Sequence, residues 1–206
     1  MKLPEEVEAL FDEASRRRKT AASSRFTSAI CGNEWDRFIE QWATISYVFV
    51  AHALGPYATE PLPTILPLSD GAHSAGANAS FEPATGQIRL SPSVVMGNPG
   101  ITLEKITHEL THAALAAFPE GDPFYEEGFV DYSVWIMAHA PAWGVYGKAM
   151  VEAADFNIQC RRDRAMKTQT EYDAKRWAGG LFAASAYGPW VVTRLRAKKM
   201  AGDLTW

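Results

Sequence analysis

Residues 102–118, TLEKITHELTHAALAAF, form the most informative stretch of this 206-residue chain. Apolar residues such as Leu103 and Leu110 recur at helical spacing, which predicts a helix over about 102–118 with one face in the core. His108 and His112 lie nearly opposite that apolar stripe. Because residues four apart on a helix stand one above the other, the two imidazoles can bind one metal ion from the same face.

The acid between the two histidines points in a different direction. At 3.6 residues per turn, Glu109 is rotated about 100° from His108, so it can reach a water held by the metal without being a ligand. The chain contains 5 His, and in such a composition chance produces an H-E-x-x-H run in roughly one chain of a hundred. The pattern therefore favours a metal site over two unrelated surface histidines.

A third ligand is available a short distance downstream. The sequence predicts a second helix over about 123–139, after a short loop containing Pro119 and Gly121 that lets it fold back antiparallel on the first. Near the start of this helix lie two adjacent acids, Glu126 and Glu127. A carboxylate there would join the two histidines and leave one coordination position open, as in a catalytic zinc site.

The rest of the chain predicts an α+β fold. Residues 55–100 are rich in proline and glycine and contain one convincing β region, a hairpin with strands near 78–81 and 87–90. Further helices are predicted by apolar periodicity and by turn residues at about 3–14, 33–54, 144–167, 170–186 and 188–200. We therefore expect a mostly helical domain with a small, largely antiparallel sheet and a pair of helices at the site.

Composition excludes several classes of partner. Lys and Arg number 20 against 24 Asp and Glu, and this net charge of −4 argues against a dedicated nucleic-acid binder. Acids near the N-terminus argue against a secretory signal, and the longest nearly apolar stretch, Trp42 to Gly55, is shorter than the roughly 20 residues that span a bilayer. Two cysteines do not make a disulfide framework. These features predict a cytoplasmic protein with no membrane partner, and they leave its oligomeric state open.

The motifs together resemble a known family. HELTHA at 108–113, followed by EGF at 127–129 and then by Asp131 and Tyr132, is similar to the gluzincin branch of the zincin metallopeptidases. The likeness is to minimal single-domain gluzincins and to the cores of thermolysin and the M1-type aminopeptidases. It implies one zincin-like domain over 1–206, with a catalytic core at 62–197 and variable helices in 1–55.

The resemblance also implies roles for the site residues. By that match the zinc ligands are His108, His112 and Glu127, and the general base is Glu109. Asp131, four residues after the third ligand, corresponds to the acid that orients a zinc-bound histidine. Such an acid is expected on physical grounds, since a ligating imidazole usually donates its other N–H to a carboxylate.

Two matches outside the helix pair extend the resemblance. Asn78 and Ala79 are similar to the Asn-Ala of the thermolysin edge strand, which pairs with the substrate backbone. Tyr187 lies in a run, AYGPW, that resembles the helix whose tyrosine stabilises the oxyanion in minimal gluzincins. Tyr125 and Tyr132, which flank the third ligand, are alternative oxyanion donors.

The expected activity follows from these implied roles. The resemblance implies a zinc-dependent peptide-bond hydrolase, an endopeptidase, in which Glu109 acts as base on a zinc-bound water. The first alternative keeps the zinc but acts on a small amide or one dedicated peptide, since the chain is too short to add a substrate-binding domain. A second alternative is a binding module that retains the motif without catalysis.

Overall fold

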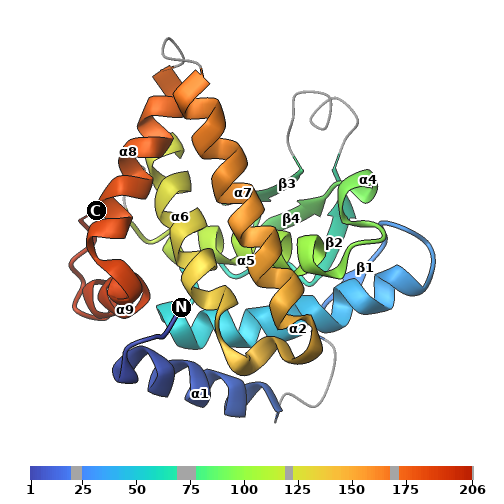
Figure 1. The fold of residues 1–206 in the computed structure, drawn as a ribbon. Coiled ribbons are helices and arrows are strands. Elements are labelled where there is room, and N and C mark those ends of the chain that lie inside the picture. The colour runs from blue at the N-terminus through green and yellow to red at the C-terminus, as the bar shows by residue number, and fades with distance from the viewer. Residues whose placement is uncertain (20–24, 69–77, 119–122, 168–171, 206) are drawn as a thin grey trace.

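In the computed structural model, which describes residues 1–19, 25–68, 78–118, 123–167 and 172–205, helices make up most of the fold and one small sheet lies at their side (Figure 1). The helices are α1 (Glu5–Lys19), α2 (Glu34–Leu54), α4 (Pro92–Val95), α5 (Pro99–Leu115), α6 (Pro123–Ala138), α7 (Gly147–Lys167), α8 (Tyr172–Ala186) and α9 (Val191–Met200). Two short 3-10 helices, η1 (Pro141–Tyr146) and η2 (Gly188–Trp190), precede α7 and α9. The predicted α+β class is confirmed, and the predicted long helices lie within a few residues of the observed ones.

The sheet has four strands in the order β1-β2-β4-β3. They are β1 (Thr27–Ser28), β2 (Thr64–Pro67), β3 (Ala79–Glu82) and β4 (Gln87–Leu90). The predicted hairpin is confirmed as the antiparallel pair β3–β4, but β1–β2 and β2–β4 are parallel. The expectation of a largely antiparallel sheet is therefore wrong, and the sheet is mixed.

The connections explain this difference. A tight turn joins β3 to β4, with the backbone N–H of Gly86 donating to the carbonyl of Glu82 at 2.8 Å, and a short turn imposes antiparallel pairing. Between β1 and β2 lies the whole of α2, and a crossover of that length permits parallel pairing. Strand β1 was not predicted, because two residues carry no alternation that a sequence pattern could reveal.

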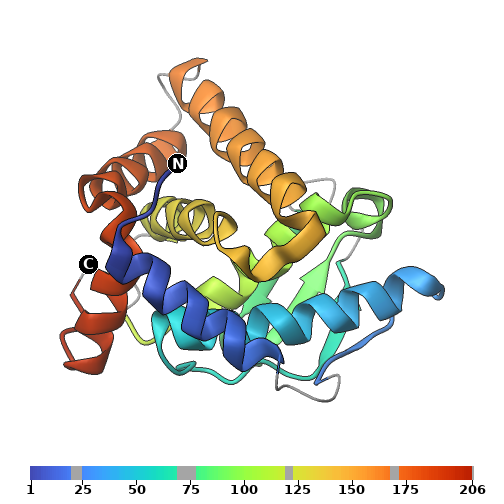
Figure 2. The same ribbon diagram turned by 60° about the horizontal axis from the view of Figure 1, so that its bottom comes forward.

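Helix α5 forms the centre of the molecule. Helices α2, α6 and α7 pack against it, strands β3 and β4 also contact it, and α2 lies between α5 and α1 (Figure 2). The helix begins at Asn98, whose side chain accepts the backbone N–H of Ile101, followed by Pro99 in the first helical position. It is buried along most of its length, including its charged residues Glu104, Lys105 and Glu109. A helix that buries this many polar groups must provide them with partners inside the protein.

Two glycines bring α6 and α8 into backbone contact. A Cβ atom added to Gly128 on α6 would overlap the backbone nitrogen of Leu181, and one added to Gly180 on α8 would overlap the carbonyl oxygen of Tyr125. The neighbouring Gly179 has no such constraint, because its added Cβ would lie 3.8 Å from the ring of Tyr125. The small residues therefore set how closely these two helices approach.

The sequence also bears on membrane-spanning helices and on disulfide bonds. Within the described ranges, no helix combines the length and apolar character that crossing a membrane requires. Cys31 and Cys160 are both free thiols; Cys31 is half-buried and Cys160 is exposed. The loop residues Pro119 and Gly121 lie outside the described residues.

Candidate metal centre

Three side chains from α5 and α6 converge at one point. The Nε2 atoms of His108 and His112 lie 3.2 Å apart. Glu127 places Oε1 3.1 Å from Nε2 of His112 and Oε2 3.3 Å from Nε2 of His108. The His108 side chain is 4% exposed, against 17% for His112 and 27% for Glu127, so the group opens toward solvent on the side of the latter two.

This geometry fits a metal ion. Ligand atoms that surround a tetrahedral Zn²⁺ at about 2.0–2.1 Å stand roughly 3.3 Å from one another. The separation of the two Nε2 atoms, 3.2 Å, and that of Oε1 of Glu127 from Nε2 of His112, 3.1 Å, are close to this value. The 3.3 Å separation from Nε2 of His108 belongs to the other oxygen of Glu127, Oε2. Two imidazole nitrogens facing each other are also poor partners without a proton or a cation between them. The donor set of two imidazoles and one carboxylate is one that zinc accepts, with a fourth position left open.

Each histidine has a second carboxylate behind its ring. Nδ1 of His112 lies 3.0 Å from Oε1 of Glu126, and Nδ1 of His108 lies 3.1 Å from Oδ1 of Asp131. The second contact has the distance of an ion pair but not the alignment of a hydrogen bond. The structure thus separates the two adjacent acids: Glu127 faces both Nε2 atoms, whereas Glu126 lies at the opposite nitrogen of His112. A carboxylate in that position fixes the tautomer and the orientation of a ligating ring.

A further layer supports Asp131, whose side chain is fully buried. Its carboxylate accepts hydrogen bonds from Asn157 Nδ2 at 2.9 Å and from Trp177 Nε1 at 2.8 Å. Arg161 of α7 places Nε 3.2 Å from Oδ2 of Asp131 and Nη1 3.0 Å from Oε2 of Glu127. Residues of α7 and α8 therefore hold the acids of α6 in place.

Sequence reasoning missed these supporting residues. A signal was present in α7, where four residues form a single stripe at helical spacing: Met150, Ala154, Asn157 and Arg161. The first two are apolar and buried, and the last two are polar and lie on the same side of the helix. A polar pair in line with a core stripe indicates contact with a buried polar group. Trp177 carries no comparable signal, since a tryptophan in a helix is usually a core residue.

The charges around the histidines favour a cation between them. Burial alone would lower the pKa of His108, but the carboxylates of Glu127 and Asp131 outweigh it and raise that pKa to about 9. Burial likewise opposes the charge on His112, and Glu127 and Glu126 raise its pKa well above the usual range. In turn the histidines hold the pKa of Glu127 well below its ordinary value despite burial. The site therefore stabilises positive charge at the point where the donor atoms meet.

Glu109 is buried on the same helix and is 4% exposed. Burial raises the pKa of its carboxyl group, while the positive charges of His108, His112 and Lys105 act in the opposite direction. Lys105 stands one turn before Glu109 and pairs with Glu104 at 2.9 Å. A carboxylate whose pKa is raised by burial is better matched to accepting and returning a proton near neutral pH than one in water.

The structure does not bring Tyr187 to the histidines through any described contact. It lies at the corner between α8 and η2, as the sequence predicts, with its side chain partly exposed. Its ring centroid is 6.4 Å from that of Phe129. Phe129 is two residues beyond Glu127 and so lies about 200° around α6 from that side chain. The oxyanion role of Tyr187 stays a prediction, as do the alternative roles of Tyr125 and Tyr132.

The residues expected to bind substrate lie at an edge of the sheet. β3 is the last strand in the order and packs against α5. The carbonyl oxygen of Asn78 accepts the backbone N–H of Ser91 at 2.9 Å, and Ala79 is paired in register with Leu90. Because antiparallel residues alternate in the direction of their hydrogen bonds, the backbone groups of Ala79 point away from β4, to the open side. Among the described residues, no strand pairs with the outward backbone groups of Ala79, whereas the carbonyl of Asn78 is occupied.

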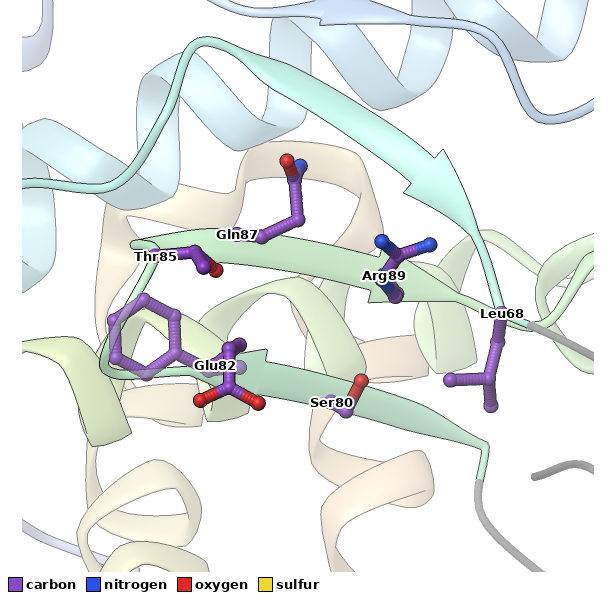
Figure 3. Close-up of a pocket in the computed structure, with 7 residues that line it drawn as sticks. Leu68, Ser80, Glu82, Thr85, Gln87 and Arg89 are labelled. Carbon is purple, nitrogen blue, oxygen red and sulfur yellow. The ribbon is translucent and has the colours of Figure 1, made fainter.

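A separate pocket of about 440 Å³ lies on β3 and β4 (Figure 3). It is lined by Leu68, Ser80, Phe81, Glu82, Thr85, Gln87 and Arg89. None of these residues belongs to the metal centre, so the pocket and the centre are different places on the molecule.

Comparison with known proteins gives no further guide to identity. No family model matches the chain, and no curated protein or solved structure does so either. The fold and the site together define an α+β protein with a candidate centre of two histidines and one glutamate.

Proposed function

We propose that this protein is a zinc-dependent hydrolase of peptide bonds, of the gluzincin type. One observation carries the proposal: Nε2 of His108, Nε2 of His112 and the carboxylate of Glu127 stand 3.1–3.3 Å from one another. Structural zinc sites are closed by four protein ligands, and three ligands with one open position are typical of catalytic ones.

In this proposal, side chains of the protein accept and return the proton during hydrolysis. Zinc bound at this centre would polarise a carbonyl oxygen and acidify water. Glu109, buried beside the histidines, accepts the proton of the attacking water and returns it to the leaving amine. Asp131 and Glu126, at the outer nitrogens of the two histidines, keep both Nε2 atoms free to act as ligands.

The open edge of β3 supports an extended substrate. A peptide can pair with the outward backbone groups of Ala79 as an added strand, and β3 packs against the helix that carries the histidines. An endopeptidase uses this mode of binding, since it needs no free terminus of the substrate. A small amide would not use the edge, so activity confined to small amides or to a single peptide would point to the alternative, a tailoring enzyme.

Substitution of Glu109 by glutamine tests the proposal. Glu109→Gln keeps the size of the side chain but removes the base, so we expect about one zinc per chain to be retained while hydrolysis falls by about 10²–10⁴-fold. Metal content measured by atomic emission and cleavage of an unstructured protein followed by mass spectrometry give the two readouts. Glu8→Gln, at an exposed position on α1, is the matched control and should leave both readouts unchanged.

Two outcomes would contradict the proposal. If the purified parent protein binds no zinc after dialysis against a zinc solution, the proposed zinc site is wrong. Full hydrolysis by zinc-loaded Glu109→Gln would leave the centre but assign the base to another residue.

A further inference from the structure

Arg161 connects the third ligand to the acid behind the first histidine. Its side chain reaches from α7, with Nη1 3.0 Å from Oε2 of Glu127 and Nε 3.2 Å from Oδ2 of Asp131. The side chain is 34% exposed, so the guanidinium lies at the border between the buried acids and solvent. Two nitrogens of one rigid planar group thus contact two different carboxylates.

The two acids depend on Arg161 to different degrees. Asp131 also accepts hydrogen bonds from Asn157 and Trp177, which would hold it without the arginine. Glu127 has no comparable support: among the residues that the structure describes, it contacts Arg161 and the two histidines. Its Oε2 is buried and lacks an aligned hydrogen bond, and it lies 3.0 Å from Nη1 of Arg161 and 3.3 Å from Nε2 of His108. Since a histidine that binds a metal is neutral, Arg161 is the cation that stays at this oxygen when metal is bound.

We propose that Arg161 is a positioning residue that makes Glu127 a one-oxygen ligand. This inference rests on the metal centre of the proposed function. A carboxylate can bind a metal through one oxygen or through both, and a second bound oxygen occupies space that water and substrate need. With Nη1 of Arg161 at Oε2, this oxygen is engaged by a cation and Oε1 is left for the metal.

Lysine cannot perform the same task at this position. A guanidinium presents donors in a fixed plane, whereas an ammonium is a single point of charge on a flexible stem. The contacts to Glu127 and Asp131 are made by different nitrogens, so one ammonium would satisfy one carboxylate at a time. Arg161→Lys therefore keeps the charge of the site and removes the bridge.

The test uses the whole 206-residue chain loaded with Co²⁺. The visible absorption of Co²⁺ weakens and shifts as the number of ligands bound to this ion rises. We expect the Co²⁺ form of Arg161→Lys to absorb severalfold less than that of the parent, and kcat of the zinc form to fall by about 10–100-fold with little change in KM. Arg162→Lys, at the next and exposed position of α7, is the matched control and should behave as the parent.

The outcomes separate this inference from the proposed function. A parent that binds no Co²⁺ or Zn²⁺ would overturn both. A parent that binds the metal, together with an unchanged Co²⁺ spectrum in Arg161→Lys, would overturn the positioning role alone. X-ray absorption at the zinc edge of the parent needs no variant: one carboxylate oxygen at about 2.0–2.2 Å supports the role, and two such oxygens refute it.

Discussion

At the scale of single residues, two adjacent acids of the candidate centre, Glu126 and Glu127, occupy different positions. Glu126 and Glu127 follow each other on α6, yet they meet opposite nitrogens of His112. Successive residues on a helix differ by about 100° in direction, so one points between the histidines and the other reaches behind a ring. The structure therefore separates a candidate ligand from a candidate orienting group where the sequence offers two similar acids.

This separation predicts unequal effects of removing each acid. Glu127→Ala removes a candidate ligand and should abolish stoichiometric zinc binding. Glu126→Ala removes a group beyond the ligands and should weaken zinc binding by about 10–100-fold. Competition with a fluorescent chelator measures both affinities. The opposite order of effects would assign the ligand to Glu126.

The sequence predicts the inner part of the site better than its support. His108, His112 and Glu109 lie within one helical turn, so helix geometry alone relates their directions. Glu127 is one short connection away and could be reached by resemblance to a known motif. Asn157, Arg161 and Trp177 come from later helices, and their contacts with Asp131 and Glu127 depend on how α7 and α8 pack, which no local pattern specifies.

At the scale of secondary structure, the contact between α6 and α8 bears on where the candidate ligand Glu127 lies. Gly128 is next to Glu127, and its lack of a side chain lets α8 approach the backbone of α6. The approach brings Trp177 of α8 within hydrogen-bond distance of Asp131. A change in the spacing of these helices would thus move the acids of the candidate metal centre.

Two neighbouring glycines in α8 provide a matched test of this contact. Gly180→Ala should destabilise the protein by about 1–3 kcal/mol, because its Cβ would overlap the carbonyl of Tyr125. Gly179→Ala should stabilise it by roughly 0.5–1 kcal/mol, since that position is exposed and alanine is the better helix former. Urea denaturation of the zinc-free proteins gives both free energies of unfolding. Equal effects of the two substitutions would show that α6 and α8 are not in close contact.

The helices and the hairpin could be predicted from sequence, but the parallel pairings of the sheet could not. Long amphipathic periods such as that of α2 identify a helix, and the turn at Gly86 identifies β3 and β4 as a hairpin. The parallel pairings of β2 join segments that are distant in sequence, with Ile65 opposite both Ser28 and Ile88. Which distant strands pair depends on the packing of α2 and α5 beneath them, and the sequence of a four-residue strand does not encode it.

At the scale of the whole molecule, the charges of the candidate centre make folding stability depend on pH, and metal binding would change this dependence. Without metal, Glu127 and Asp131 raise the pKa of His108 to about 9, above its ordinary value of 6.5. The folded state therefore binds a proton that the unfolded state releases between these two values. The resulting stabilisation is fully present below about pH 6.5 and is lost as the pH rises toward 9.

This linkage predicts a pH dependence that zinc should abolish. Metal-free protein should lose on the order of 2–3 kcal/mol of its free energy of unfolding between pH 6.5 and 9. Zinc-loaded protein should not, because ligand rings are neutral at the coordinating nitrogen and bind metal more tightly as protons become scarce. Urea denaturation at several pH values measures both forms. Metal-free His108→Gln should show a smaller loss, and an undiminished loss in that variant would assign the effect to another group.

The close approach of Gly128 and Gly180 to the opposite helix also bears on how proteins of this architecture can be found by sequence. A pattern built from the two histidines and the glutamate describes the donors but not the spacing of the helices that carry them. The search pattern can also require a small residue directly after the glutamate and a second small residue in the helix that follows α7. It then describes both the donors and the spacing of the helices. Such a pattern would pass over chains in which HExxH lies on an exposed helix with no partner behind it.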